Sequence, residues 1–168
     1  WESAEELVGT VLRRARQRAP GRQLRARLEP DLPLLHGDAM LLTQLLDNLV
    51  DNALQHTPPD SPIELLVRRA PAAGDAPPGV VLAVRDRGPG VPPAWRERIF
   101  DVFQRGEPRA GVPAQRPGIG VGLAVCRAIA RAHGGDLRLR ARSHGGSSFE
   151  CQLPGAAQPA AEPGPACR

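Results

Sequence analysis

The stretch DAMLLTQLLDNLVDNALQHT, residues 38–57, carries the clearest structural pattern in the chain. Its apolar residues recur every three or four positions, which is the period of an amphipathic α-helix. Asp38 can cap the first turn, and Thr57 with the two prolines that follow ends the pattern. The spacing therefore predicts a helix from Asp38 to about His56 that buries one face.

A polar stripe runs along the other side of this predicted helix. It consists of four residues spaced four apart: Gln44, Asn48, Asn52 and His56. Residues at this spacing lie close to one line on a helix. Asn is a mediocre helix former because its side chain competes for backbone hydrogen bonds, so two in line need a reason. The Asn oxygen is a suitable hard ligand for Mg²⁺. A merely solvated face is the alternative, and the stripe alone favours it.

The rest of the chain alternates short periodic segments with turns. Helices are expected over residues 3–19 and 120–133, with a short one from Pro92-Pro93 to near Ile99. Strands are expected over residues 22–29, 63–69, 80–84, 136–142 and 147–153. Residues 70–79 are expected to form a hairpin loop and residues 104–117 a mobile loop. Strands adjacent in sequence suggest hairpins, so we expect an α/β two-layer sandwich with a mixed five-stranded sheet and three main helices on one face.

Length and composition restrict the class of protein. A chain of 168 residues suits one domain, here residues 1–154, with a disordered Pro- and Ala-rich tail over residues 155–168. The net charge of +4 permits a phosphate-bearing partner. The arginines are scattered and aromatic residues make up only 3%, so no nucleic acid partner is expected.

The cysteines and the chain start bear on location. Cys126, Cys151 and Cys167 have neither metal-ligand spacing nor the pattern of a disulfide framework, which favours a reducing compartment. The chain opens at Trp1 without a signal peptide, and its apolar runs are too short to span a membrane. We therefore expect a cytoplasmic fragment of a longer protein.

Two glycine-containing motifs are candidates for ligand binding. The sequence Asp86-Arg87-Gly88-Pro89-Gly90 follows a predicted strand directly, where a carboxylate can accept hydrogen bonds and glycines allow close approach. The sequence GIGVGL, residues 118–123, opens a predicted helix and would bring backbone N–H groups to an anion. Its spacing is neither a dinucleotide fingerprint nor a Walker A loop. Taken singly, an ordinary turn and a flexible hinge explain these motifs as well.

Taken together, these motifs resemble a known family. The order is the Asn-rich helix, Asp-x-Gly-x-Gly, then Phe100 and Phe103, a loop, and Gly-x-Gly-x-Gly-Leu. Phe100 and Phe103 by themselves indicate packing. The order resembles the N, G1, F and G2 boxes of the ATP-binding catalytic (HATPase_c) domain of sensor histidine kinases, with the Bergerat fold shared by gyrase, Hsp90 and MutL. The likeness spans about residues 3–154.

Within this family, three stretches are most similar to the Kdp-type potassium-sensing kinases. They are DNALQHTPPDSPIE, residues 51–64, DRGPG, residues 86–90, and CRAIARAHGG, residues 126–135.

The resemblance implies a role for each matching residue, with ATP and Mg²⁺ as the bound groups. Asn52 would bind the Mg²⁺ that bridges the ATP phosphates, and Asn48 would lie near those phosphates; both are the expected catalytic residues. Asp86 would accept a hydrogen bond from the adenine amine. The other expected nucleotide-binding residues are Gln55, His56, Gly88, Gly90, Val91, Phe103, Arg105, Gly118, Ile119, Gly120, Val121, Gly122 and Leu123.

The sequence departs from the family pattern at one position of this site. Family members commonly carry Lys three residues after the Mg²⁺-binding Asn, where this chain has Gln55. Arginines in the loop could supply the missing charge: Arg105, which is best placed, Arg109 and Arg116.

The phosphoacceptor helix is missing from this chain. All four histidines fall in or beside the elements of the ATP domain: His36, His56, His133 and His144. The resemblance therefore implies a monomeric fragment that binds ATP–Mg²⁺ without phosphorylating itself.

The parent is expected to be a homodimeric, inner-membrane-anchored sensor histidine kinase for potassium or osmotic sensing. It would phosphorylate a histidine on a separate dimerisation domain and pass the phosphoryl group to a response-regulator receiver domain.

Two alternatives remain. An ATP-hydrolysing relative would need a Glu base where this chain has Asn48, which cannot take a proton. A degenerate protein-interaction module without kinase activity is supported by Gln55, and tight Mg²⁺-dependent nucleotide binding would exclude it.

Overall fold

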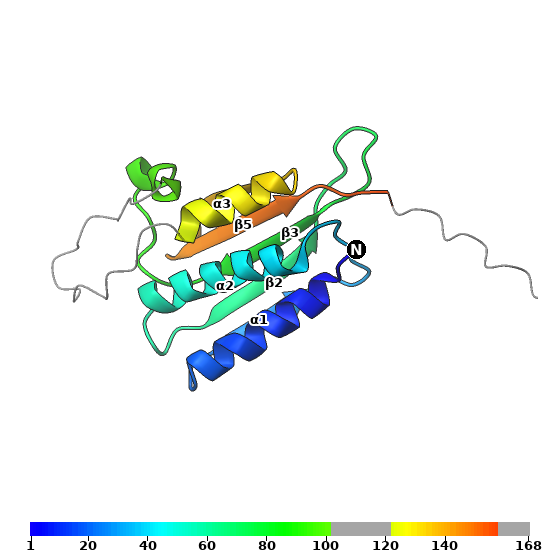
Figure 1. Cartoon of the computed structure of the whole chain (residues 1–168). Coiled ribbons are helices and arrows are strands. Elements are labelled where there is room, and N and C mark those ends of the chain that lie inside the picture. Colours follow the sequence, from blue (N-terminus) through cyan, green and yellow to red (C-terminus); the bar gives the residue numbers. More distant parts are fainter. Residues whose placement is uncertain (102–121, 158–168) are drawn as a thin grey trace, which may run out of the picture.

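The computed structural model describes residues 1–101 and 122–157, which form one layer of helices over one sheet (Figure 1). The helices are α1 (Ala4–Arg18), α2 (Ala39–His56) and α3 (Gly122–Ala132). The strands are β1 (Leu24–Leu28), β2 (Ile63–Arg69), β3 (Val80–Arg85), β4 (Asp136–Ala141) and β5 (Ser147–Leu153), in the spatial order β1-β2-β3-β5-β4. Only β1 and β2 pair in parallel, so the sheet is mixed. The expected two-layer α/β sandwich is confirmed.

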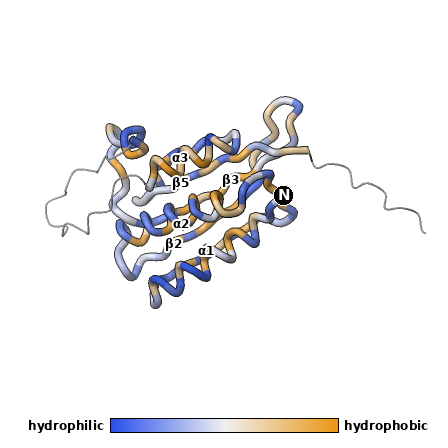
Figure 2. Tube along the Cα trace, in the orientation of Figure 1, coloured by the Kyte–Doolittle hydropathy of each residue, from blue (hydrophilic) through white to orange (hydrophobic). Residues whose placement is uncertain are grey.

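Helix α2 is the central element of the helical layer. Asp38 caps its first turn by accepting a hydrogen bond from the Leu41 amide at 3.0 Å. Its apolar face is buried through the side chains of Leu42, Leu45, Leu46, Leu49, Val50 and Ala53. Burial of one such leucine contributes about 1.5–3 kcal/mol, so this face anchors the helix to the sheet. Figure 2 shows hydrophobic residues recurring along α2 and through the central strands behind it. No helix in the described ranges is long and apolar enough to cross a membrane.

Both ends of α2 are tied to other parts of the chain. At its start, the Asp38 amide donates to Nε2 of His133, which follows α3, at 3.1 Å. At its end, Arg22 donates to the carbonyl oxygens of Leu54 at 3.4 Å and Thr57 at 3.2 Å, which a helix would otherwise leave unpaired. These contacts fix α2 along its axis and so fix the position of its polar stripe.

The structure corrects several expected bounds. The expected strand over residues 22–29 is shorter, and Ala26 is exposed because β1 is an edge strand that pairs only with β2. The expected short helix after Pro92 is instead two 3₁₀ turns, η1 (Pro93–Trp95) and η2 (Arg98–Phe100). Helical segments of only one turn often take the tighter 3₁₀ hydrogen-bond pattern. The expected loop over residues 104–117 and the start of the expected helix at residue 120 lie outside the described residues.

The packing role of Phe100 is confirmed. It is buried, and its ring packs edge-on against Phe149 with 6.3 Å between the ring centroids. Phe103 lies outside the described residues.

Two free cysteines lie in the core between α3 and the sheet. Cys126 and Cys151 are both fully buried. The Cys126 thiol donates to the Leu45 carbonyl oxygen at 3.4 Å. Burial raises the pKa of each thiol from 9.0 to about 12. The folded chain therefore holds these two protons more tightly than the unfolded chain does.

These thiols predict a loss of stability at high pH. Each contribution is complete below pH 9 and is lost as the pH rises from 9 toward 12. At pH 10.5 the free energy of unfolding should fall by about 2 kcal/mol per thiol, measured by urea denaturation in a Cys167→Ser background. The chain has no Lys or Tyr to titrate in this range. Cys151→Ala should halve this loss of stability. If the double variant Cys126→Ala/Cys151→Ala lost as much stability at pH 10.5 as the unmodified chain, the thiols would not be its origin.

Gly88, in the segment after β3, packs against the end of α2. A Cβ atom at this position would lie 2.5 Å from the carbonyl oxygen of His56, which is backbone and cannot rotate away. Only glycine allows the two segments to approach in this way.

This contact predicts opposite outcomes for two Gly→Ala substitutions. Gly88→Ala should lower the free energy of unfolding by about 1–3 kcal/mol through overpacking. Gly9→Ala is the matched control, because nothing lies within 4 Å of its Cβ position on helix α1. It should raise stability by up to about 1 kcal/mol through helix propensity. Urea denaturation checks both, and equal stabilities would contradict the packing argument.

Candidate functional site

The expected nucleotide-binding residues within the described ranges gather at one end of the molecule. The end of α2, the end of β3, the turns η1 and η2 and the start of α3 come together there (Figure 1). The segment after β3 touches the end of α2, because Gly88 packs on the His56 carbonyl oxygen. This end therefore holds the candidate site.

Asp86 is the most deeply placed polar residue of the site. It directly follows β3, and only 4% of its surface is exposed. Its Oδ1 accepts hydrogen bonds from the amides of Gly88 at 2.8 Å and Ser147 at 3.4 Å. Its Oδ2 accepts none from any residue that the structure describes. A carboxylate oxygen that no described donor meets can accept a charge-assisted hydrogen bond from a ligand.

Thr57 supplies a second unpaired polar atom. Its Oγ1 is buried and has no hydrogen-bond partner among residues 1–101 and 122–157. Thr57 follows His56, whose carbonyl oxygen lies against Gly88. Native proteins rarely leave such an atom unsatisfied. Asp86 Oδ2 and Thr57 Oγ1 thus both lack a hydrogen-bond partner among the described residues.

The polar stripe of α2 divides in the structure. Gln44, Gln55 and His56 are exposed, as a solvated face would be, whereas Asn48 and Asn52 are half-buried. The Asn48 side chain lies beside the Cys126 thiol of α3, and it partly counters the rise in the thiol pKa that burial causes. Asn52, one turn further toward the site, has no hydrogen-bond partner among the described side chains. The two asparagines therefore differ in their surroundings: Asn48 lies beside a thiol of α3, whereas Asn52 lies nearer the end of α2.

The glycine motif after β3 continues the wall of the site. Gly90 has a φ of +74°, a conformation that favours glycine over other residues. Val91 is half-buried, and its carbonyl oxygen accepts a hydrogen bond from Arg96 at 3.3 Å. At the other side, Gly122 and Leu123 begin the described part of α3 and are both half-buried. The remaining expected site residues lie outside the described ranges: Phe103, Arg105, Gly118, Ile119, Gly120 and Val121.

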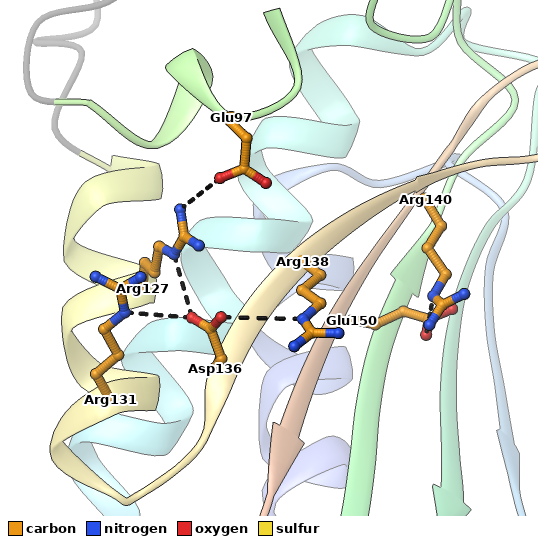
Figure 3. Close-up of polar contacts among 7 residues, drawn as sticks. All are labelled: Glu97, Arg127, Arg131, Asp136, Arg138, Arg140 and Glu150. Atoms are coloured by element: carbon orange, nitrogen blue, oxygen red, sulfur yellow. Dashed lines mark hydrogen bonds and ion pairs between the residues drawn. The ribbon is translucent and has the colours of Figure 1, made fainter. Parts of the chain in front are cut away.

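An arginine network holds the 3₁₀ turns beside α3, as Figure 3 shows. Arg127 of α3 donates to Glu97 at 3.2 Å and to Asp136 at 3.1 Å, and it lies over the Phe100 ring. Arg131 joins the same Asp136 carboxylate at 3.3 Å. Arg127 beside Asp136 holds the pKa of that carboxyl below its usual range. The network fixes the polypeptide that leaves η2 relative to the helix that begins at Gly122.

Sequence reasoning missed several residues that shape the site. Thr57 was taken only as a helix terminator, and Ser147 only as the start of a strand. The sequence does hold one signal near Ser147, the pair Gly145-Gly146. Both glycines have positive φ, and such pairs often mark a turn that packs closely against another segment. Nothing in the local sequence shows that Arg127 reaches Glu97.

Known proteins are similar to this chain in sequence and in fold. Residues 37–157 match the family of histidine kinase-, DNA gyrase B-, and HSP90-like ATPases. Sensor protein KdpD of Escherichia coli (strain K12) is 36% identical over 156 residues, which are 92% of this chain and 16% of KdpD. The mycobacterial sensor histidine kinase MprB has a TM-score of 0.75 at 27% identity, over 92% of this chain and 97% of that chain. Full-length ShkA in complex with AMPPNP has a TM-score of 0.73 at 27% identity, over 92% of this chain and 31% of that chain.

The shared region includes the elements that form the site. The family match begins just before α2 and continues past the end of β5. The chain spans only about a sixth of the length of KdpD, at 16%. It therefore belongs to the histidine kinase-, DNA gyrase B-, and HSP90-like ATPase family, as an ATP-binding domain of the kind found in sensor histidine kinases.

Proposed function

We propose that this chain binds ATP with Mg²⁺ and acts as the catalytic domain of a two-component sensor histidine kinase. The observation that carries the proposal is the pair of unpaired polar atoms, Asp86 Oδ2 and the buried Thr57 Oγ1. An adenine ring carries both an amine donor and ring-nitrogen acceptors, which are the partners that these two atoms lack. The likeness to ShkA, which was solved with AMPPNP, supports a nucleotide as the ligand.

On the phosphate side, Asn52 is the residue that would hold Mg²⁺. Its half-buried amide has no partner among the described residues, and an amide oxygen suits this cation. Asn48 lies one turn away, beside the Cys126 thiol, and would border the phosphates. The other bordering residues would be Gln55, His56, Gly88, Gly90, Val91, Gly122 and Leu123. Bound Mg²⁺ would supply charge neutralisation at the phosphates.

The reaction that we propose is transfer of the γ-phosphoryl group to a histidine on a separate dimerisation domain of the parent protein. Transfer to an aspartate of a response-regulator receiver domain would follow. Phosphoryl transfer depends mainly on positioning and electrostatics, and Asp86 would position the adenine while Asn52 positions the metal. The likeness to KdpD and MprB supports this role. The resemblance to Kdp-type kinases extends it to potassium or osmotic sensing by a homodimeric, membrane-anchored parent.

A second candidate is a binding module of the same fold without kinase activity. Gln55 favours it, because this exposed side chain brings no positive charge to the phosphates. Mg²⁺-dependent nucleotide binding together with phosphoryl transfer would exclude it.

The first test concerns adenine recognition. Asp86→Asn should weaken AMPPNP binding by about 10- to 100-fold, because the amide offers no charge-assisted acceptor to the amine. Calorimetry in the presence of Mg²⁺ measures this affinity, and circular dichroism checks that the variant is folded. Asp75→Asn, an exposed change in the loop between β2 and β3, should leave affinity unchanged. Equal affinity of Asp86→Asn and the unmodified chain would contradict the assignment.

The second test concerns catalysis. The chain alone should incorporate no phosphate from γ-labelled ATP, and a mixture with the dimerisation fragment of its parent should label that fragment on histidine. Asn52→Ala should abolish the labelling through loss of the metal ligand. Gln44→Ala, an exposed change two turns away on the same stripe, is the control and should label normally. Labelling of the isolated chain on its own histidines would overturn the reading of a catalytic domain that needs a separate acceptor.

A further inference from the structure

We propose that the turn between β4 and β5 positions Asp86 for adenine recognition, and that Arg87 and Arg142 are the positioning residues through which it acts. The inference rests on the proposed function, since it assigns a role toward the adenine that Asp86 would bind.

Contacts between the two segments run in both directions. From the segment after β3, Arg87 Nη1 donates to the carbonyl oxygens of Ser143 at 2.8 Å and Gly145 at 3.0 Å. From the turn after β4, Arg142 Nη1 donates to the Asp86 carbonyl oxygen at 2.9 Å. Each segment thus supplies a guanidinium group to carbonyl oxygens of the other. Such bonds from a charged donor are stronger than bonds between neutral groups.

The turn that Arg87 holds has an uncommon backbone. Three consecutive residues have positive φ: His144 at 68°, Gly145 at 91° and Gly146 at 96°. This conformation costs about 1–2 kcal/mol for a residue with a side chain, such as His144. The two hydrogen bonds from Arg87 flank His144 in sequence and offset this cost. Arg87 therefore stabilises a turn that would not keep this shape without support.

The shape of the turn determines the setting of Asp86. Gly146 packs so tightly on the Asp86 carbonyl oxygen that a Cβ atom would overlap it. The next residue, Ser147, exchanges two hydrogen bonds with Asp86: it accepts from the Asp86 amide at 2.9 Å and donates to Oδ1 at 3.4 Å. The turn thus touches the amide, the carbonyl oxygen and the carboxylate of Asp86. A change in the turn would move the carboxylate directly.

Three arginines lie close together near Asp86, and their mutual repulsion must be offset. Burial lowers the pKa of Arg142, and the nearby guanidinium groups of Arg87 and Arg85 act in the same direction. Glu64, which pairs with Arg85 at 3.6 Å, and Asp86 itself act against them. Arginines gathered in this way repel one another, and their carbonyl partners and the Asp86 charge offset the repulsion.

Displacement of the Asp86 carboxylate should affect one part of the ligand selectively. Hydrogen bonds weaken steeply with distance and angle, so the bond to the adenine amine is sensitive to a small shift. ATP and ITP differ at this position, where ITP has a carbonyl oxygen in place of the amine. The ratio of their affinities therefore reports on the Asp86 contact, because the phosphate and Mg²⁺ contacts are the same for both nucleotides.

The experiment measures the dissociation constants of ATP and ITP, each with Mg²⁺, by calorimetry. The unmodified chain should prefer ATP by at least about tenfold, the value of one good hydrogen bond to a charged acceptor. Arg142→Gln and Arg87→Gln should each reduce this preference at least about threefold. The matched control is Arg138→Gln on β4, an exposed arginine whose ion pair is with Asp136 at 3.9 Å. It should keep the full preference.

A second comparison distinguishes positioning from a general structural role. In an Asp86→Asn background, Arg142→Gln should change the ATP-to-ITP ratio no further, because its effect passes through the carboxylate. Equal weakening of ATP and ITP by Arg142→Gln would overturn the proposal, as would an unchanged ratio. If Arg142→Gln fails to fold, Arg87→Gln and Arg142→Lys take its place. An unchanged ATP-to-ITP ratio in both of these variants would overturn the proposal. Failure of the unmodified chain to bind ATP would overturn the proposed function itself, which separates the two outcomes.

Discussion

The Asp86 carboxylate follows β3 in a place that water hardly reaches, and a carboxylate there must be stabilised by hydrogen bonds. Two backbone amides meet one of its oxygens, and they come from segments on either side, at Gly88 and Ser147. Both segments must approach closely for this, which explains the absence of a side chain at Gly88 and Gly146. Within our proposal, the second oxygen would accept a hydrogen bond from the adenine amine. The form of the surrounding loops thus follows from how one charge is buried.

Helix α2 buries its leucine face in the core and also holds its asparagine side at a fixed position. Its leucine face must be buried, which alone would allow it to shift along its axis or rotate slightly. Contacts at its two ends, from His133 and Arg22, remove that freedom. The asparagine side can then be presented to the site with a fixed register. Asn48 lies on the same side of α2, beside the Cys126 thiol of α3.

Features that depend on neighbouring residues could be predicted from the sequence, and features that depend on distant residues could not. The course of α2 is a local matter of leucine period and an Asp38 cap, and the predicted helix matches the observed one closely. Asp86 and Gly88 were recognisable because their motif is contiguous. The contacts of Arg87 and Arg142 join positions 56 or more residues apart, and no local pattern reports them. The 3₁₀ turns after Pro92 were missed because a helix signal of one turn does not distinguish hydrogen-bond patterns.

The same arginines bear on how the site would neutralise a triphosphate. Among the described residues at this end of the molecule, Arg87 and Arg142 are engaged with carbonyl oxygens, and Arg127 is engaged with two carboxylates. Gln55 contributes no charge. Releasing one of these arginines to a phosphate would break contacts that shape the site. Within our proposal, Mg²⁺ at Asn52 would supply most of the charge, and Arg105, outside the described part, would add to it. Nucleotide affinity in this chain should consequently depend more on the metal than in relatives that carry the lysine.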